Sequence, residues 1–290
     1  MMDWFPPRQV TVVIASALLL LANFPARAAD PFRIGKNTRP IGPETETAFN
    51  SIFKQGDYLA AKRHLEQALQ SSAETNDPLT YSLLASLAFM ERNWVSFSRY
   101  ADQTQETAKR LTAKDPLRGN LYQAVGYFLE ASFDVSPAGD GLVRGTPKAL
   151  SKVQQMLKAL DQAVAVDPHD PELNLVKGFM DLMLASDLAL LSPAQAIQRL
   201  EDYAAPEYLA QRGIAIAYRD MKQPAKALNA VNKALQAAPE NPELFYLKAQ
   251  ILHLQGKTSE SVTLFDQALA KQNQLPPSLV QQITRERNRT

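Results

Sequence analysis

Residues 208–239 read YLAQRGIAIAYRDMKQPAKALNAVNKALQAAP, and residues 242–273 read PELFYLKAQILHLQGKTSESVTLFDQALAKQN. The two stretches align with a shift of 34 residues, which places Ala215 on Ala249. Each copy has the pattern of an apolar helix, a short polar turn and a second, amphipathic helix that ends in an alanine. The small residues allow two helices to approach closely, and the larger apolar residues fill the space between them. A repeat of this period indicates helix pairs that stack on one another.

The same pattern continues upstream with some drift. Four earlier helix pairs are expected at about 42–75, 78–114, 119–168 and 171–203. The pattern over residues 44–275 resembles the tetratricopeptide repeat family, and the Asp-Pro and Asn-Pro junctions fit the prolines that separate such repeats. The resemblance implies an all-α solenoid of about six antiparallel helix pairs, and residues 277–287 have the pattern of a short C-terminal capping helix.

The N-terminus has the features of an export signal. The apolar run 10–24 is 15 residues long, or about 22 Å as a helix, which is shorter than a bilayer core of about 30 Å. Ala26 and Ala28 provide the small residues that signal peptidase requires, so we expect residues 1–28 to be a signal peptide cleaved before Ala29. The alternative is an uncleaved membrane anchor. Cleavage would place the protein in the periplasm or another extracytoplasmic compartment, or in the thylakoid lumen if the source is photosynthetic.

The rest of the chain divides by composition into three parts. Residues 29–43 contain three prolines and two glycines and are expected to be a linker. The repeat domain should cover 44–275, and a capping helix with a short tail should cover 276–290. No later stretch approaches 18 consecutive apolar residues, so we expect no integral membrane span after signal cleavage.

Charge and cysteine content exclude several classes of function. The chain has 31 Lys and Arg against 30 Asp and Glu, and removal of residues 1–28 makes the two numbers equal. An even balance gives no electrostatic reason to bind nucleic acid, so we expect no nucleic-acid partner. The chain has no cysteine, which rules out disulfides, thiolate metal sites and cysteine nucleophiles.

No motif in the sequence predicts catalysis. His64, His169 and His253 belong to three different helix pairs and have no metal-binding spacing, and no GxSxG motif occurs. We therefore expect a protein that is not an enzyme, with no catalytic residues, no metal and no cofactor. The alternative is an enzyme or small-ligand-binding protein with its site at 134–147, an expected loop with three glycines near Arg144.

A solenoid of helix pairs exposes a concave groove lined by the first helix of each pair. If Ala215 and Ala249 face the neighbouring helix, the residues beside that stripe face the groove. Aromatic, methionine and arginine side chains are typical of protein-binding surfaces. The predicted groove residues are Phe89, Met90, Tyr127, Phe179, Met183, Arg212, Ile216, Arg219, Tyr246, Gln250 and His253.

Each of these residues also has a purely structural explanation. The apolar ones could belong to the interior. The two arginines could lie on a solvated face or form a salt bridge to Asp220 or Glu201.

The sequence thus predicts an exported scaffold or adaptor that binds a partner protein or peptide in its concave groove. The resemblance implies a role in the assembly or stabilisation of an envelope or photosynthetic-membrane complex. A third possibility is a structural spacer that has no groove ligand. The sequence leaves the identity of the partner and the oligomeric state open.

Overall fold

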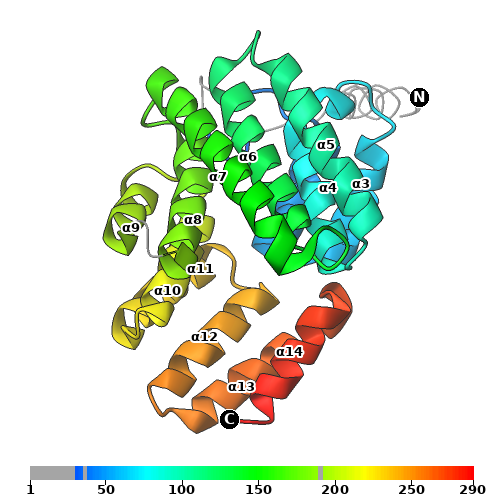
Figure 1. The fold of residues 1–290 in the computed structure, drawn as a ribbon. Helices are drawn as coiled ribbons and strands as arrows, with labels where there is room; N and C mark the ends of the chain where they lie inside the picture. Colours follow the sequence, from blue (N-terminus) through cyan, green and yellow to red (C-terminus); the bar gives the residue numbers. More distant parts are fainter. Residues whose placement is uncertain (1–29, 35–37, 189–191) are drawn as a thin grey trace, which may run out of the picture.

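The computed structural model describes residues 30–34, 38–188 and 192–290, and every regular element in these ranges is helical (Figure 1). The predicted signal peptide, residues 1–28, lies outside the described residues. Within the described part, no helix combines the length and the hydropathy needed to cross a bilayer.

Six helix pairs follow one another along the chain. They are α2 (Pro43–Asn50), extended by the π-helical turn η2 (Ser51–Gln55), with α3 (Tyr58–Ala68); α4 (Pro78–Met90) with α5 (Trp94–Leu111); α6 (Pro116–Asp134) with α7 (Gly141–Val166); α8 (Pro171–Leu188) with α9 (Pro193–Asp202); α10 (Glu207–Asp220) with α11 (Pro224–Ala237); and α12 (Pro242–Leu254) with α13 (Thr258–Leu269). Short 3-10 turns follow α3 and α13, at η3 (Glu74–Asn76) and η4 (Gln272–Gln274), and α14 (Pro277–Arg287) ends the array. The expected all-α solenoid of six pairs with a capping helix is confirmed.

The junctions between pairs show why the first helices begin where they do. Asp77, Asp115 and Asn241 each accept a hydrogen bond from a backbone N–H of the helix that follows. The next residue in each case is a proline at the first helical position, where its missing N–H costs nothing. The Asp-Pro and Asn-Pro dipeptides are therefore start signals for helices.

The turns inside several pairs use one residue with a left-handed backbone conformation. The φ angle is +69° at Gly56, +56° at Arg92, +56° at Lys222 and +73° at Gly256. Glycine adopts this conformation without strain, whereas for arginine and lysine it is modestly unfavourable. At Gly56 a side chain is also excluded by contact, since a Cβ atom there would lie 2.6 Å from Cδ of Pro242.

The buried apolar residues that the structure describes form one large cluster and two smaller ones, and alanines lie where helices cross. Ala215, Ala249, Ala234 and Ala268 are all fully buried. Gly178 has the same role in α8, because a Cβ atom there would lie 2.5 Å from Leu200 of α9. Small residues at these crossings let the backbones approach closely and let larger side chains fill the flanking space.

The segment before α2 is part of the folded domain. The sequence predicts a linker at 29–43, but in the described part of this segment Phe32 and Ile41 are 4% and 1% exposed. The Phe32 ring meets the Phe49 ring edge-on, with centroids 5.0 Å apart. The described part of this segment therefore packs against the repeats and is not a free connection.

The two ends of the array contact each other: the first two helix pairs meet the sixth pair and α14. The Tyr58 hydroxyl of the first pair donates to Glu243 of the sixth pair at 2.8 Å, and the Asn241 amide donates to the backbone oxygen of Phe53 at 3.0 Å. The Ser278 hydroxyl, on α14, donates to the backbone oxygen of Met90 at 3.3 Å. In Figure 1 the orange and red helices lie directly below the blue-to-green helices. The concave side of the solenoid is consequently a partly enclosed space instead of an open trough.

Candidate functional site

The first helices of five consecutive pairs, α2, α4, α6, α8 and α10, surround a cavity of about 480 Å³, which we call the inner cavity. Phe32 of the N-terminal segment and Tyr58 of α3 also line it. Among the described residues that line the cavity, Arg212 is the one charged residue. The apolar lining includes Phe49, Phe53, Leu83, Val125, Phe128, Phe179, Met180, Met183, Leu209 and Ile216.

The lining follows from the helical period of the sequence. In α4 the cavity is lined by Leu79, Ser82, Leu83 and Ser86, which lie on one stripe of the helix. The opposite side of α4 packs against α5, so this helix is apolar almost all round. The same arrangement recurs in α6, α8 and α10, and the stripes together form one apolar surface.

Arg212 stands at the place where the first and sixth pairs meet. Its guanidinium is 2.6 Å from one carboxylate oxygen of Glu243, whose other oxygen accepts the Tyr58 hydroxyl. Burial opposes the charge on Arg212, but the Glu243 carboxylate outweighs this effect and raises the pKa of the guanidinium. Burial, together with Glu243, raises the pKa of the Tyr58 hydroxyl. The interactions of these three side chains therefore hold the first, fifth and sixth helix pairs together.

A second, more exposed hollow lies between the turn that joins α4 to α5 and the capping helix α14. It has a volume of about 670 Å³, and we call it the outer hollow. Phe89 is 46% exposed there and contacts the Trp94 ring edge-on, with centroids 5.7 Å apart. The described residues that line the outer hollow are Phe89, Met90, Arg92, Trp94, Pro137, Ser278, Leu279, Gln282 and Arg285.

Two arginines flank the aromatic residues of the outer hollow. Neither Arg92 nor Arg285 forms an ion pair with any residue that the structure describes. The Arg285 Nε donates to the backbone oxygen of Gln281 within its own helix. The outer hollow therefore combines accessible aromatic surface with positive charge that the described residues leave unpaired.

A third apolar pocket of about 260 Å³, which we call the middle pocket, shares lining residues with both spaces. Phe53, Ser86 and Phe128 line both the middle pocket and the inner cavity. Phe89 and Met90 line both the middle pocket and the outer hollow. Apolar residues thus line three neighbouring spaces, from the surface at Phe89 to the middle of the concave side.

The structure separates the predicted groove residues into several places. Phe179, Met183, Arg212 and Ile216 line the inner cavity, and Phe89 and Met90 line the outer hollow. Tyr127 packs against the main hydrophobic core. Arg219, Gln250 and His253 line a different pocket at the C-terminal end of the array.

The capping helix α14 covers Tyr246, the remaining predicted groove residue, and also contacts Gln250. Glu286 accepts hydrogen bonds from the Tyr246 hydroxyl at 2.6 Å and from the Gln250 amide at 2.7 Å. Burial, together with this carboxylate, raises the pKa of Tyr246. Arg219 pairs with Asp220 at 2.7 Å, one of the two salt bridges that the sequence suggested, whereas Arg212 pairs with Glu243.

Several lining residues were not predicted from the sequence. Trp94 lies beside Phe89 across the short turn between α4 and α5, whereas nothing in the local pattern places Leu279 there. Leu279 reaches this place because α14 returns to the second helix pair, a contact between segments nearly 190 residues apart in the chain. The tryptophan at the start of a helix was the one local signal.

The alternative site at 134–147 does not have the expected shape. The helix α6 extends to Asp134 and α7 begins at Gly141, so the expected loop of 14 residues is wrong and only 135–140 separates the helices. A Cβ atom at Gly145 would collide with the backbone oxygen of Asp134. This glycine is required for close packing of α7 on the end of α6. Lys148 pairs with Asp140 at 2.6 Å and so is not available as a free cation for a phosphate.

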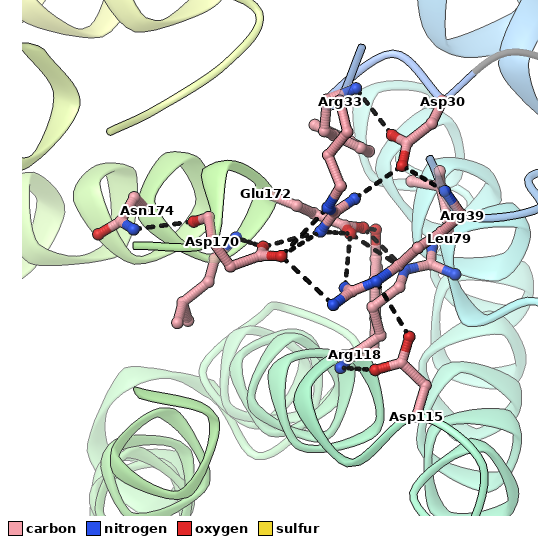
Figure 2. Close-up of polar contacts among 12 residues, drawn as sticks. Asp30, Arg33, Arg39, Leu79, Asp115, Arg118, Asp170, Glu172 and Asn174 are labelled. Carbon is pink, nitrogen blue, oxygen red and sulfur yellow. Dashed lines mark hydrogen bonds and ion pairs between the residues drawn. The ribbon is translucent and has the colours of Figure 1, made fainter. Parts of the chain in front are cut away.

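A buried cluster of charges lies elsewhere, where the N-terminal segment meets the second to fourth pairs (Figure 2). The Arg33 guanidinium is 2.6 Å from Asp170 and 2.9 Å from Glu172, and Arg118 is 3.0 Å from Glu172. Burial opposes ionisation of Glu172, but Arg118 and Arg33 outweigh it and lower the pKa of this carboxyl.

Buried charges often mark functional sites, but the charged groups of this cluster form ion pairs with one another. Glu172 is fully buried and also accepts the Tyr122 hydroxyl at 2.8 Å, and Arg118 reaches Asp77 at 3.2 Å. Asp77 and Asp170 also accept backbone N–H bonds at the starts of α4 and α8. The cluster therefore fixes helix ends and the N-terminal segment in place.

The three histidines do not come together. His64 contacts Glu44 at 2.7 Å, His169 stacks on Tyr203 with centroids 4.6 Å apart, and His253 is exposed. In the part of the chain that the structure describes, no group of three metal-ligating side chains is close enough to hold an ion. The expectation that the protein is not an enzyme stays a prediction.

Comparison with protein families agrees with the repeat pattern in the last two helix pairs. Residues 212–276 match the family model of the tetratricopeptide repeat. A thermophilic TPR protein of Thermus thermophilus, known from a crystal structure, is similar with a TM-score of 0.47 and 20% sequence identity, over 72% of this chain and 97% of that chain. No curated protein matches the sequence. The predicted resemblance is thus confirmed for the last two helix pairs.

Proposed function

We propose that this chain, which carries tetratricopeptide repeats at residues 212–276, is a scaffold that binds a partner protein at the outer hollow. Proteins with these repeats are generally scaffolds for other proteins and not enzymes. A rigid array of helix pairs suits this role because it offers a preformed surface and loses little conformational entropy on binding.

The observation that carries the proposal is the composition of the outer hollow. Phe89 and Trp94 supply accessible aromatic surface, and Arg92 and Arg285 stand beside it without a carboxylate partner among the described residues. Tryptophan and arginine are among the residues most enriched in binding hot spots. An apolar segment that carries acidic side chains would complement both features, because it would cover the rings and pair the two guanidinium groups.

We also propose that the scaffold works outside the cytoplasm. Support comes from the export signal that the sequence predicts at residues 1–28. A role in the assembly or stabilisation of an envelope or photosynthetic-membrane complex would suit an exported scaffold. Cell fractionation followed by N-terminal sequencing tests this point. A mature terminus at Ala29 in an extracytoplasmic fraction supports it, and an intact Met1 on protein in the cytoplasmic fraction contradicts it.

The partner can be identified by photo-crosslinking in the native cells. A photoreactive phenylalanine analogue replaces Phe89 in the outer hollow, and a matched variant carries it at Ser151, which is exposed on α7 and lines none of the cavities described above. The proposal predicts one crosslinked protein from position 89, joined through an apolar segment with acidic residues. Equal products from both positions would contradict it, and no product from either would favour the structural spacer.

The identified segment then allows the two arginines to be tested by affinity. Arg92→Glu combined with Arg285→Glu should weaken binding by about a hundredfold, since two charge-assisted contacts of about 1.5 kcal/mol each are replaced by repulsion. Arg63→Glu is the control, because Arg63 is exposed on α3 and lines none of the cavities. Equal losses in the double variant and the control would show that the partner binds elsewhere.

A further inference from the structure

We propose that the inner cavity binds a small molecule with an uncharged hydrocarbon chain, at a site separate from the outer hollow. The cavity volume of about 480 Å³ falls within the range of about 300 to 1,000 Å³ that is usual for small-molecule sites. Its lining comes from five first helices, the N-terminal segment and Tyr58 of α3, so the ligand would be held at the centre of the array.

The polar groups in the lining already have partners. The Tyr58 hydroxyl donates to Glu243, and the Tyr122 hydroxyl donates to Glu172. The hydroxyls of Ser82 and Ser86 donate to backbone oxygens of their own helix. The carbonyl groups of a peptide would therefore lose hydrogen bonds to water on entering the cavity without gaining replacements, which is costly. A hydrocarbon chain has no such groups to satisfy.

The one charged side chain among the described lining residues also has a partner. Arg212 lies 2.6 Å from Glu243, which neutralises it. A carboxylate placed in the cavity would compete with Glu243 for this arginine and leave one of the two negative charges buried and unpaired. The balance of charge therefore favours an uncharged ligand over a fatty acid.

The shape favours an elongated ligand. The middle pocket adjoins the inner cavity on the side of the outer hollow and shares Phe53, Ser86 and Phe128 with it. Water in such a space finds few hydrogen-bonding partners and is easily displaced by apolar groups. A hydrocarbon chain is slender enough to occupy both adjoining apolar spaces.

The test measures binding of the apolar fluorophore N-phenylnaphthylamine to the purified protein. The proposal predicts a saturable rise in fluorescence that dodecanol reverses, at least as effectively as dodecanoate does. The blocked peptide acetyl-trileucine amide, of similar apolar character, should not reverse it. No saturable rise, better displacement by dodecanoate, or equal displacement by the peptide would each overturn the proposal.

Space-filling variants locate the site. Ser82→Phe combined with Ser86→Phe places two rings in the cavity from partly exposed positions, and should weaken fluorophore binding by about tenfold or more. Ser151→Phe adds the same ring outside the cavity and should leave binding unchanged. Far-UV circular dichroism of each variant confirms that it is folded. If the folded double variant binds the fluorophore as tightly as the unaltered protein, the site is not the inner cavity.

The two proposals can fail separately. Arg92→Glu with Arg285→Glu alters the outer hollow alone, so it should leave fluorophore binding unchanged. Loss of fluorophore binding in this variant would show that the probe binds at the outer hollow, which would overturn the assignment to the inner cavity.

Discussion

Replacement of Arg33 by methionine is the sharpest test of how the N-terminal segment is held. The side chain of Arg33 is 6% exposed and pairs with Asp30, Asp170 and Glu172 at 2.9, 2.6 and 2.9 Å. Methionine keeps much of the length and apolar contact but removes the charge. The three carboxylates then lose a shared cation in a place with little access to water.

The expected loss of stability follows from the contacts that remain. Removing one partner of a buried ion pair usually costs about 3–5 kcal/mol. Here Glu172 keeps Arg118, and Asp170 keeps Arg39 at 3.3 Å. We therefore expect the lower end, about 3 kcal/mol, which corresponds to a fall in Tm of about 6–12 °C for a domain of this size.

Urea denaturation followed by far-UV circular dichroism measures the loss. The control is Lys62→Met, because Lys62 is 44% exposed and pairs with Glu91, which is 41% exposed, at 2.8 Å. Such a surface pair contributes less than about 1 kcal/mol. If Arg33→Met costs no more than Lys62→Met, the buried cluster does not hold the N-terminal segment and our description of its role is wrong.

Three further predictions concern the same cluster, a turn and the closure of the array. The pKa of Glu172 is lowered in the folded state. Its carboxylate therefore contributes its full stabilisation above the unfolded pKa of about 4.3, and this contribution is lost as the pH falls from that value through the folded pKa. The difference in unfolding free energy between the protein and Glu172→Gln should narrow from pH 5 to pH 3, and a constant difference would contradict this. Gly56→Ala should lower the free energy of unfolding by about 2–3 kcal/mol and Gly256→Ala by about 1 kcal/mol. Both glycines have a positive φ, but only at Gly56 would a Cβ atom meet a neighbour. Equal shifts in thermal unfolding would count against the contact. Tyr58→Phe removes a hydrogen bond to Glu243 and should increase hydrogen exchange at 51–58 and 241–247, whereas unchanged exchange would show that this bond does not help to close the array.

The sequence predicted the helix pairs well because their signals are local. The junctions around Asp77 and Asn241 combine a capping side chain with a proline, and both features act on the helix that starts there. The crossing alanines Ala215 and Ala249 are also set by the period of their own helices. Each signal can be read from a few neighbouring residues.

The candidate sites depend on contacts that local signals do not contain. Arg33 and Asp170 are 137 residues apart in sequence, and Tyr58 and Glu243 are 185 apart. Whether such residues meet depends on small rotations between successive pairs, which accumulate along a solenoid. Helical phase alone suggested an open groove that included Tyr246, but the return of the capping helix covers this residue.

Hydrogen–deuterium exchange of the protein with and without its crosslinked partner segment tests the central claim most directly. The claim is that the partner binds at the outer hollow, where the second helix pair meets α14. It predicts that protection from exchange is concentrated in residues 86–94 and 278–285, which contain most of the lining of that hollow. Protection confined to the second helices α7, α9 and α11, with none at the outer hollow, would contradict the account.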